Sequence, residues 1–280
     1  MSKVLTRLRA SLEDLSPVLK RVARYVLDHP ENAIYHSVTE LAEATQSSEG
    51  SIIRFCQDLG YSGFQEFKLT LAVELDPRHR GRRPTRVVGD GSAAHLMADI
   101  AEQAALTLRD TASLYEAHAF CEVADRLARA RRIDVYGVGA SGVIAQYFAY
   151  KLLRLGKTVQ AFVDLHLGSM SASNLDADCV AIGVSSSGST VDTLKALQAA
   201  RAAGAYTVAV TNRLKSPLAK HADQNLLASP PESPLTGGDV FAKVGQLLVL
   251  EALVQTMVGA DLALRDSEQR TAQVVADKSL

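Results

Sequence analysis

Six consecutive residues in the second half of the chain have side chains suited to binding an anion: Ser185, Ser186, Ser187, Gly188, Ser189 and Thr190. The apolar run before them, residues 180–184, predicts a buried strand, and the pattern from Val191 onward predicts a helix. A loop between a strand and a helix directs backbone N–H groups and short hydroxyls to one point, where the helix dipole favours negative charge. Taken alone, this loop fits a phosphate-binding site and a serine-rich helix cap equally well.

A second glycine-rich loop, Gly137–Gly142, has the pattern G-x-G-x-x-G between a predicted strand and a predicted helix. With Asp164 at the end of the following strand, this pattern is typical of dinucleotide-binding domains. However, Ser141 stands where close approach of the backbone to a dinucleotide excludes most side chains, and the loop 185–190 repeats the same strand–loop–helix design. Two hydroxyl-bearing loops facing one crevice suit a compact sugar phosphate better, and the dinucleotide alternative stays open.

These loops need a sheet that holds them side by side. Strand-like runs alternate with helical segments from residue 133 onward, at 133–139, 158–163, 179–184, 206–211 and 225–228. Such alternation predicts an α/β fold, a parallel sheet flanked by helices on both faces in an αβα sandwich. Ligands bind at the carboxyl ends of the strands in these sheets, which is where both loops lie. A further amphipathic helix is expected over 239–258.

The first quarter of the chain predicts an all-α domain. Ser37 and Glu40 have the spacing of a capping box, and a second short helix starts after Ser48 and stops at Gly60. Two short helices joined by a tight turn match the helix-turn-helix pattern, in which the start of the second helix reads base edges. A small helical bundle without a ligand is the alternative. Residues 1–77 carry eight Lys and Arg against eleven Asp and Glu, so no basic surface favours DNA by itself.

Residues 76–91 interrupt the helical pattern with Pro, Gly and Arg, which marks a linker between two domains. From Arg78 to Gly91 there are five Arg against one Asp, a net charge of +4. This segment is either a solvated linker or an additional contact to DNA phosphates.

Length and composition narrow the class of protein. A chain of 280 residues has room for two domains, and 47% hydrophobic with 22% charged residues is ordinary for a globular protein. The net charge of −1 predicts no general attraction to nucleic acid or membranes. The three cysteines form no CxxC pair, and no stretch approaches the roughly 20 apolar residues of a membrane helix. We therefore expect a cytoplasmic protein with no metal site and no cofactor.

The amino-terminal residues 1–77 resemble the DNA-binding domain of RpiR-type transcription regulators. The resemblance rests on Leu41-Ala42, Ser48, Ile52, Arg54-Phe55-Cys56, Leu59-Gly60-Tyr61-Ser62-Gly63-Phe64 and Glu66-Phe67-Lys68. Gln46-Ser47 replaces the usual Gly-Val of the turn, and Gly50 stands where Ala is common. The resemblance implies double-stranded operator DNA as a partner. The expected DNA contacts are Ser37, Ser48, Glu49, Ser51, Arg54 and Lys68.

Residues 118–258 resemble the SIS (sugar isomerase) domain. The motifs are GVGASG, Asp164-Leu-His166, the S-x-S-G-x-T pattern, and Thr211-Asn212 followed by Ser216-Pro217-Leu218-Ala219 and Ala222-Asp223. The resemblance implies a phosphosugar effector, and a homodimer or dimer of dimers with pockets near the subunit interface. The expected effector contacts are Gly139, Ser141, His166, Ser185, Ser186, Ser187, Gly188, Thr190 and Lys243.

Turnover of a sugar phosphate would need a carboxylate or histidine base near its first two carbons. The candidates are His166, Asp164, Glu251 and Lys243, and no isomerase-like glutamate motif follows residue 230. We therefore predict a sensor with no catalytic residues.

Together these features predict a DNA-binding transcriptional regulator of sugar metabolism whose SIS domain senses a phosphosugar. The predicted parts are a helix-turn-helix domain at 1–77, a linker at 78–92, the SIS domain with its leading helix at 93–258, and a polar, fraying tail at 259–280. A phosphosugar isomerase with an accessory helical domain, and a dinucleotide-binding protein, remain the alternatives.

Overall fold

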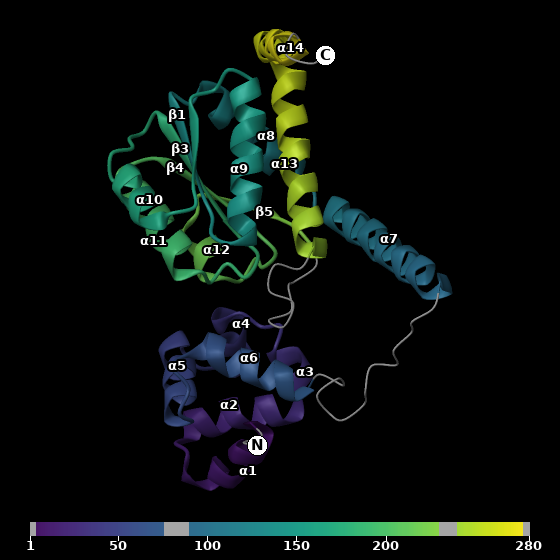
Figure 1. Ribbon diagram of the computed structural model, residues 1–280. Coiled ribbons are helices and arrows are strands. Elements are labelled where there is room, and N and C mark those ends of the chain that lie inside the picture. Colours follow the sequence, from purple (N-terminus) through teal and green to yellow (C-terminus); the bar gives the residue numbers. More distant parts are fainter. Residues whose placement is uncertain (1–3, 76–89, 230–239, 277–280) are drawn as a thin grey trace. The chain divides into compact units, whose positions relative to one another are not determined.

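The computed structural model describes residues 4–75, 90–229 and 240–276. Contacts between residues divide the chain into two compact units, and the boundary falls within one helix, after Glu102. Figure 1 shows the elements of both units. The predicted linker at 78–92 lies outside the described residues up to residue 89.

The first unit is built from helices throughout its described part. These are α1 (Val4–Ser11), η1 (Leu12–Asp14), α2 (Pro17–Asp28), α3 (Pro30–Ala33), α4 (Val38–Ala44), α5 (Glu49–Asp58) and α6 (Phe64–Leu75). One apolar core joins them, and Val22, Leu41 and Phe55 in it are fully buried. The ring of Phe67 on α6 lies with its centroid 5.6 Å from that of Phe55, so α6 packs over α5.

The helix-turn-helix consists of α4 and α5. Ser37 Oγ accepts a hydrogen bond from the Glu40 amide, and the Glu40 carboxylate accepts one from the Ser37 amide, so the predicted capping box is confirmed. Ser48 caps α5 by accepting from the amide of Ser51. In the turn between the helices Gln46 has a φ of 49°, a left-handed conformation that costs energy for any residue with a side chain.

Arg21 on α2 fastens this turn. Its guanidinium donates to the carbonyl oxygens of Thr45 and Gln46 at 3.1 and 2.8 Å. The strained residue is therefore held by a neighbouring helix as well as by the turn itself.

The second unit alternates strands and helices after a long leading helix. Its elements are α7 (Asp90–Ser113), whose first residues fall in the first unit, then α8 (Ala117–Arg129), β1 (Arg132–Tyr136), α9 (Ala140–Arg154), β2 (Val159–Phe162), α10 (Leu165–Ala172), β3 (Cys179–Ser185), α11 (Val191–Ala202), β4 (Tyr206–Thr211), α12 (Pro217–His221), β5 (Gln224–Leu227), α13 (Val240–Ala260) and α14 (Leu262–Ala276).

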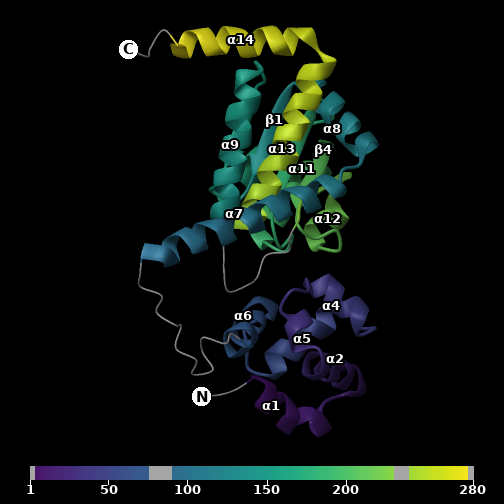
Figure 2. The same cartoon turned by 90° about the vertical axis from the view of Figure 1, so that its right-hand side faces the viewer.

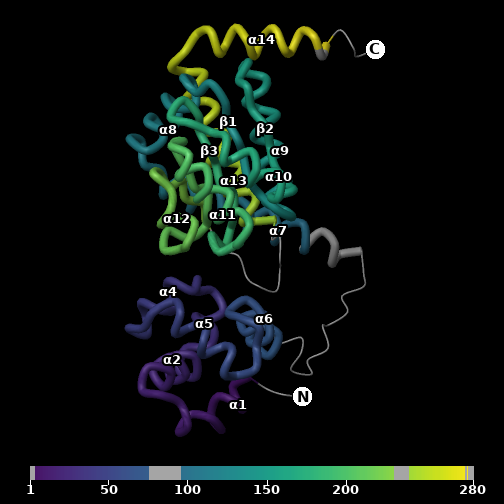
Figure 3. Tube along the Cα trace, turned by 90° about the vertical axis from the view of Figure 1, so that its left-hand side faces the viewer, coloured from purple at the N-terminus to yellow at the C-terminus, as the bar shows by residue number. Residues whose placement is uncertain are grey.

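The five strands are all parallel, in the order β2-β1-β3-β4-β5. Helices lie on both faces of the sheet (Figure 3), and alternate residues of a strand face opposite layers. Val135 and Ile182 pack with α8, α9 and α13, whereas Tyr136 and Ala181 pack with α10, α11 and α12. The predicted parallel sheet between two layers of helices is confirmed.

The predicted fraying tail is wrong for residues 262–276. They form α14, which runs across the end of α9 (Figure 2). Leu264 is buried in the core of the unit, and Thr271 Oγ1 donates to the carbonyl oxygen of Arg154 at 3.1 Å. This bond satisfies a carbonyl at the carboxyl end of α9 that its own helix leaves without a partner.

Among the described residues, α13 alone is long and apolar enough to cross a membrane by length and composition, contrary to the expectation that no segment is. Half of its most apolar window is buried inside the structure. Leu250, Leu253 and Val254 belong to the same core as the sheet. The apolar sequence of α13 is thus explained by its position as a core helix.

Candidate functional site

The loops after β1 and β3 lie beside each other at the carboxyl edge of the sheet. β2 pairs with one side of β1 and β3 with the other, so the strand order reverses at β1. The two loops, 137–142 and 185–190, flank this switch point, which is where open parallel sheets bind their ligands.

The loop 185–190 is cross-linked by its own hydroxyls. Ser185 Oγ accepts from the amide of Gly188 at 3.1 Å and lies 3.0 Å from Thr190 Oγ1. Ser187 Oγ accepts from the amide of Ser189 at 3.2 Å. The side chain of Thr190, the N-cap of α11, makes no capping hydrogen bond. The first turn of α11 therefore keeps amide groups available to an anion.

Gly188 fits this loop for two independent reasons. Its φ of +60° is in the left-handed region, and a Cβ at this position would stand 2.1 Å from Ser216 Oγ. Its carbonyl oxygen accepts from the amide of Leu218 at 2.9 Å. The loop thus packs against the start of α12, where Ser216 and Leu218 contact it.

Lys243 on α13 connects the two loops. It is only 9% exposed, and its ammonium group donates to Ser141 Oγ at 3.2 Å and to Ser186 Oγ. A single positive charge therefore lies between the loop after β1 and the loop after β3. Two hydroxyl-bearing loops around one buried cation favour an anionic ligand.

Gln246 and Asn212 complete this network, and neither was among the expected effector contacts, although Asn212 belongs to the Thr211-Asn212 motif. Gln246 Nε2 donates to Ser186 Oγ at 3.2 Å and to Asn212 Oδ1 at 2.9 Å, and the Asn212 amide donates to the carbonyl oxygen of Ser186 at 3.2 Å. The three residues form a closed cycle that fixes Ser186. The sequence does offer a signal for Gln246, because it is a polar residue three positions after Lys243 in a mostly apolar helix. Residues three apart lie on the same face of a helix.

The structure brings most of the predicted effector residues together, and His166 stands apart. Ser141, Ser186 and Lys243 are in direct contact, and Gly139 opens α9 with a φ of 55°. His166 is exposed at the start of α10, and none of the described hydrogen bonds joins its imidazole to the serine loops.

The carboxylates proposed as bases are engaged elsewhere. Asp164 Oδ1 accepts from the amides of His166 and Leu167 at 2.9 and 3.4 Å, as the cap of α10. Glu251 pairs with Lys151 at 3.1 Å in a groove between α9 and α13. Within the described residues no group of three or more His, Cys, Asp and Glu side chains could hold a metal ion. The site can bind an anion, and neither carboxylate faces it as a base.

In the first unit, the predicted DNA contacts fall into two groups. Arg54 and Ser48 are exposed at the start of α5, and Ser51 is half-exposed with its Oγ 2.9 Å from that of Ser48. Glu49 is half-exposed and accepts from Thr39 Oγ1 at 2.6 Å. These residues form one polar surface, as a recognition helix requires.

Ser37 and Lys68 are buried, at 3% and 4% exposure. Ser37 is the cap of α4, and Lys68 Nζ donates to the carbonyl oxygen of His36 at 2.7 Å while lying 5.4 Å from the centre of the Phe64 ring. Both side chains fasten the start of α4. This geometry does not favour the predicted contacts with DNA.

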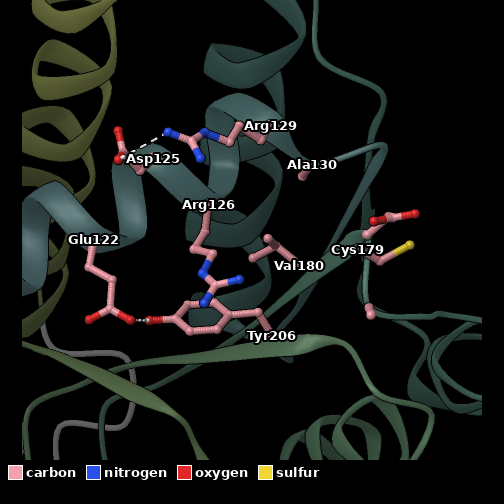
Figure 4. A pocket seen from close by; sticks show the side chains of 10 residues that line it. Glu122, Asp125, Arg126, Arg129, Ala130, Cys179, Val180 and Tyr206 are labelled. Carbon is pink, nitrogen blue, oxygen red and sulfur yellow. Dashed lines mark hydrogen bonds and ion pairs between the residues drawn. The ribbon is translucent and has the colours of Figure 1, made fainter.

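A separate polar pocket of about 470 Å³ lies at the opposite edge of the sheet, at the amino ends of β3 and β4 (Figure 4). The Arg126 guanidinium lies 4.7 Å from the centre of the Tyr206 ring, whose hydroxyl donates to Glu122 at 2.9 Å. Burial and this hydrogen bond raise the pKa of Tyr206. Arg129 pairs with Asp125 at 3.7 Å. Because these groups satisfy one another, the pocket carries no sign of a ligand.

Two family models match this chain. The model described as "Helix-turn-helix domain, rpiR family" matches residues 2–78, and the model of the SIS domain matches residues 126–256. An uncharacterized HTH-type transcriptional regulator of Caldanaerobacter subterraneus is 36% identical over 253 residues, which cover 90% of this chain and 89% of that protein. Another, of Haemophilus influenzae, is 31% identical over 281 residues, covering 99% and 98%.

A solved structure resembles the whole chain. It is described as the Vibrio vulnificus NanR protein complexed with ManNAc-6P, and it is 36% identical, covers 99% of both chains and has a TM-score of 0.89. The two relatives that match over nearly their full length bear the names of regulators and not of enzymes.

Proposed function

This chain belongs to the RpiR family of helix-turn-helix transcriptional regulators with an SIS domain, and we propose that its effector is a hexosamine 6-phosphate such as N-acetylmannosamine 6-phosphate. The observation that carries the proposal is the bridge from Lys243 to Ser141 and Ser186, one buried cation between two hydroxyl-bearing loops. Similarity over both full chains to a protein complexed with ManNAc-6P supports the sugar class.

The phosphate end of the effector is assigned to the loop 185–190. Ser185, Ser187 and Thr190 offer hydroxyls there, and the amide of Ser186 lies in the same loop before a helix, whereas the Gly188 amide is already donated to Ser185. Helix amino termini and successive backbone amides bind phosphate through their aligned dipoles. Lys243 supplies the positive charge that a phosphate dianion needs in a site with little solvent.

The sugar end is assigned to the loop after β1. Gly139 leaves space in front of α9, and the hydroxyl of Ser141 can exchange its bond from Lys243 for one to a sugar hydroxyl. His166 lies at the start of α10, which follows β2, the strand next to β1, and we assign it a contact with the far end of the sugar.

Operator DNA is assigned to the start of α5. Arg54 can donate two hydrogen bonds to a guanine edge in the major groove, and Ser48 and Ser51 can bind flanking phosphates. Residue Glu49 would accept from a cytosine amino group. Ser37 and Lys68 are left with structural roles.

A homodimer is part of the proposal, because two recognition helices must read a palindromic operator. A groove of about 580 Å³ between α7, α9 and α13 is lined by apolar side chains and by the Lys151–Glu251 ion pair, and its Val143 and Tyr147 are 63% and 39% exposed. We assign this face to a second copy of the chain. The effector would then change the spacing of the recognition helices by binding one dimer arrangement more tightly than the other. Such a regulator works in the cytoplasm, beside its operator.

Three measurements test the proposal. Purified protein is mixed with N-acetylmannosamine 6-phosphate, the unphosphorylated sugar and NAD, and its melting temperature is recorded. Only the sugar phosphate should raise it. Incubation over hours must show no isomerised or dephosphorylated product, since sustained turnover would favour an isomerase. Selection from a random DNA library should yield one palindromic duplex, and failure to enrich any sequence would contradict the DNA assignment.

A further inference from the structure

The turn of α13 that carries Lys243 and Gln246 also packs against α7. Gly245 lies between these two residues, and a Cβ there would stand 2.3 Å from the carbonyl oxygen of Ser229 and 2.9 Å from Thr111 Oγ1. No side chain other than hydrogen fits at this distance. The backbone of α13 therefore lies directly against the segment after β5, and α7 crosses this end of α13 (Figure 2).

Thr111 on α7 is locked to the same segment. Its side chain is 4% exposed, and its Oγ1 accepts from the amide of Ser229 at 3.1 Å and donates to the carbonyl oxygen of Ser229 at 3.3 Å. One hydroxyl thus holds both polar groups of one residue. Ser229 therefore lies between the Thr111 hydroxyl and the backbone of Gly245.

We propose that Thr111, Ser229 and Gly245 form a junction that transmits effector binding from the serine loops to α7. The inference rests on the proposed function, because it needs a phosphate at 185–190. A bound phosphate attracts the Lys243 ammonium and takes over its hydrogen bonds to Ser141 and Ser186. Lys243, Gly245 and Gln246 share one turn of α13. A displacement of Lys243 or Gln246 therefore also displaces Gly245.

Close packing makes the shift continue beyond α13. A contact without free space cannot absorb a displacement, so the Ser229 carbonyl must move with Gly245. Thr111 follows through its two hydrogen bonds. α7 comes next to the helix-turn-helix unit in the chain, and the boundary between the two units falls within it, after Glu102. A displacement at Thr111 therefore acts on the helix that both units share.

The test measures coupling in the full chain. Affinity for the library-selected duplex is measured with and without saturating N-acetylmannosamine 6-phosphate, and their ratio is the coupling factor, on the order of 5–150-fold in allosteric proteins. We expect Gly245→Ala to reduce this factor to less than about twofold while each ligand alone still binds within about threefold of wild type. A residue that serves only stability would lower the melting temperature and leave the ratio intact.

Matched controls separate transmission from damage. Gly259→Ala is the same change in the same helix, where a Cβ meets nothing within 4 Å, and it should leave the coupling factor unchanged. Thr111→Val removes both bonds to Ser229 at nearly constant volume and should also abolish coupling, so the inference stays testable if Gly245→Ala does not fold. Thr107→Val, one turn earlier on α7 and equally buried at 4%, is its control.

The outcomes are distinct. Wild-type coupling in both Gly245→Ala and Thr111→Val overturns the junction and leaves the proposed effector standing. Loss of effector affinity by the same factor in both variants also overturns it, because the residues would then serve binding and not transmission. A wild-type protein that ignores N-acetylmannosamine 6-phosphate refutes the proposed effector, and the sugar phosphate that does raise the melting temperature then becomes the probe.

Discussion

Serines cluster at the starts of α5 and α11, and the two clusters are held in different ways. At α5, Ser48 and Ser51 bond to each other and to their own helix, and both remain accessible. At α11, Ser185, Ser186 and Gly188 of the preceding loop are buried. Ser186 is held by residues from two other elements, Lys243 and Gln246 on α13 and Asn212 after β4.

The difference indicates the kind of ligand that each helix start can receive. Hydroxyls tied only to their own helix can adapt to the surface of a large partner such as DNA. A loop fixed from behind by other elements is preorganised, so little entropy is lost when a small anion binds. Similar residues thus form an accessible surface in one unit and a partly buried, fixed loop in the other.

The largest effect should follow from loosening the rigid loop. Gly188→Ala places a methyl group against Ser216 Oγ at a left-handed φ, and crowding and backbone strain each cost about 1–3 kcal/mol. We expect effector affinity to fall about 100-fold or more, measured by calorimetry, while operator affinity without effector persists. Gly63→Ala, in the first unit and with nothing within 4 Å of its Cβ, is the control. Unchanged effector affinity in Gly188→Ala would place the phosphate elsewhere.

Lys243→Met removes the positive charge between the two serine loops and keeps a side chain of similar length. Losing a charge-assisted hydrogen bond should cost about 1.5–3 kcal/mol, so effector affinity should fall roughly 10- to 100-fold, and its dependence on salt should weaken. The control is Lys195→Met, which removes an exposed lysine from α11. Equal losses in both variants would mean that long-range charge, and not the bridge, attracts the effector.

Arg54→Ala tests the accessible helix start. Operator affinity should fall about tenfold, since a bidentate contact to a base is worth about 1–3 kcal/mol, and preference at one base pair should relax. Arg24→Ala removes an equally charged, exposed side chain from α2 and should weaken binding less. Effector affinity should not change in either variant. A selected sequence identical to that of wild type would argue against Arg54 as a base contact.

The smallest effect concerns the turn before the accessible helix start. Gln46→Gly removes the strain of the left-handed conformation, and the greater freedom of glycine in the unfolded chain offsets part of this gain. The net effect should stabilise the first unit by roughly 0.5–1 kcal/mol. Gln57→Gly, the same change inside α5, should destabilise it by about 1 kcal/mol. Urea unfolding measures both. A destabilised Gln46→Gly protein would mean that the Gln46 side chain contributes more than its backbone costs.

Features encoded locally could be predicted from the sequence. The limits of β4, residues 206–211, follow from one apolar run, and the caps at Ser37 and Ser48 follow from residues three positions away. The loops at 137–142 and 185–190 are recognisable because each connects a predicted strand to a predicted helix. Local chemistry is enough for such features because few distant residues take part in them.

Features that depend on distant contacts could not be predicted. The sequence of α14 is polar, and its helix is anchored through Leu264 and Thr271 to elements more than a hundred residues away. Lys68 looks like a surface lysine until the fold places the His36 carbonyl beside it. The partnership of Gln246 with Asn212 depends on how α13 crosses the sheet, which no periodicity encodes.

Each unit also encloses a cysteine. Cys56 is buried in α5, where burial raises the pKa of its thiol to about 12, and Cys179 is buried at the start of β3 with its thiol pKa also raised by burial. Alkylating reagents attack the thiolate, so at neutral pH both sites react only when the surrounding structure opens. Cys121 on α8 is exposed and reacts at once. The alkylation rates of Cys56 and Cys179 in the wild-type protein therefore report local opening, one in each unit. The rate of Cys121 shows that the reagent is active.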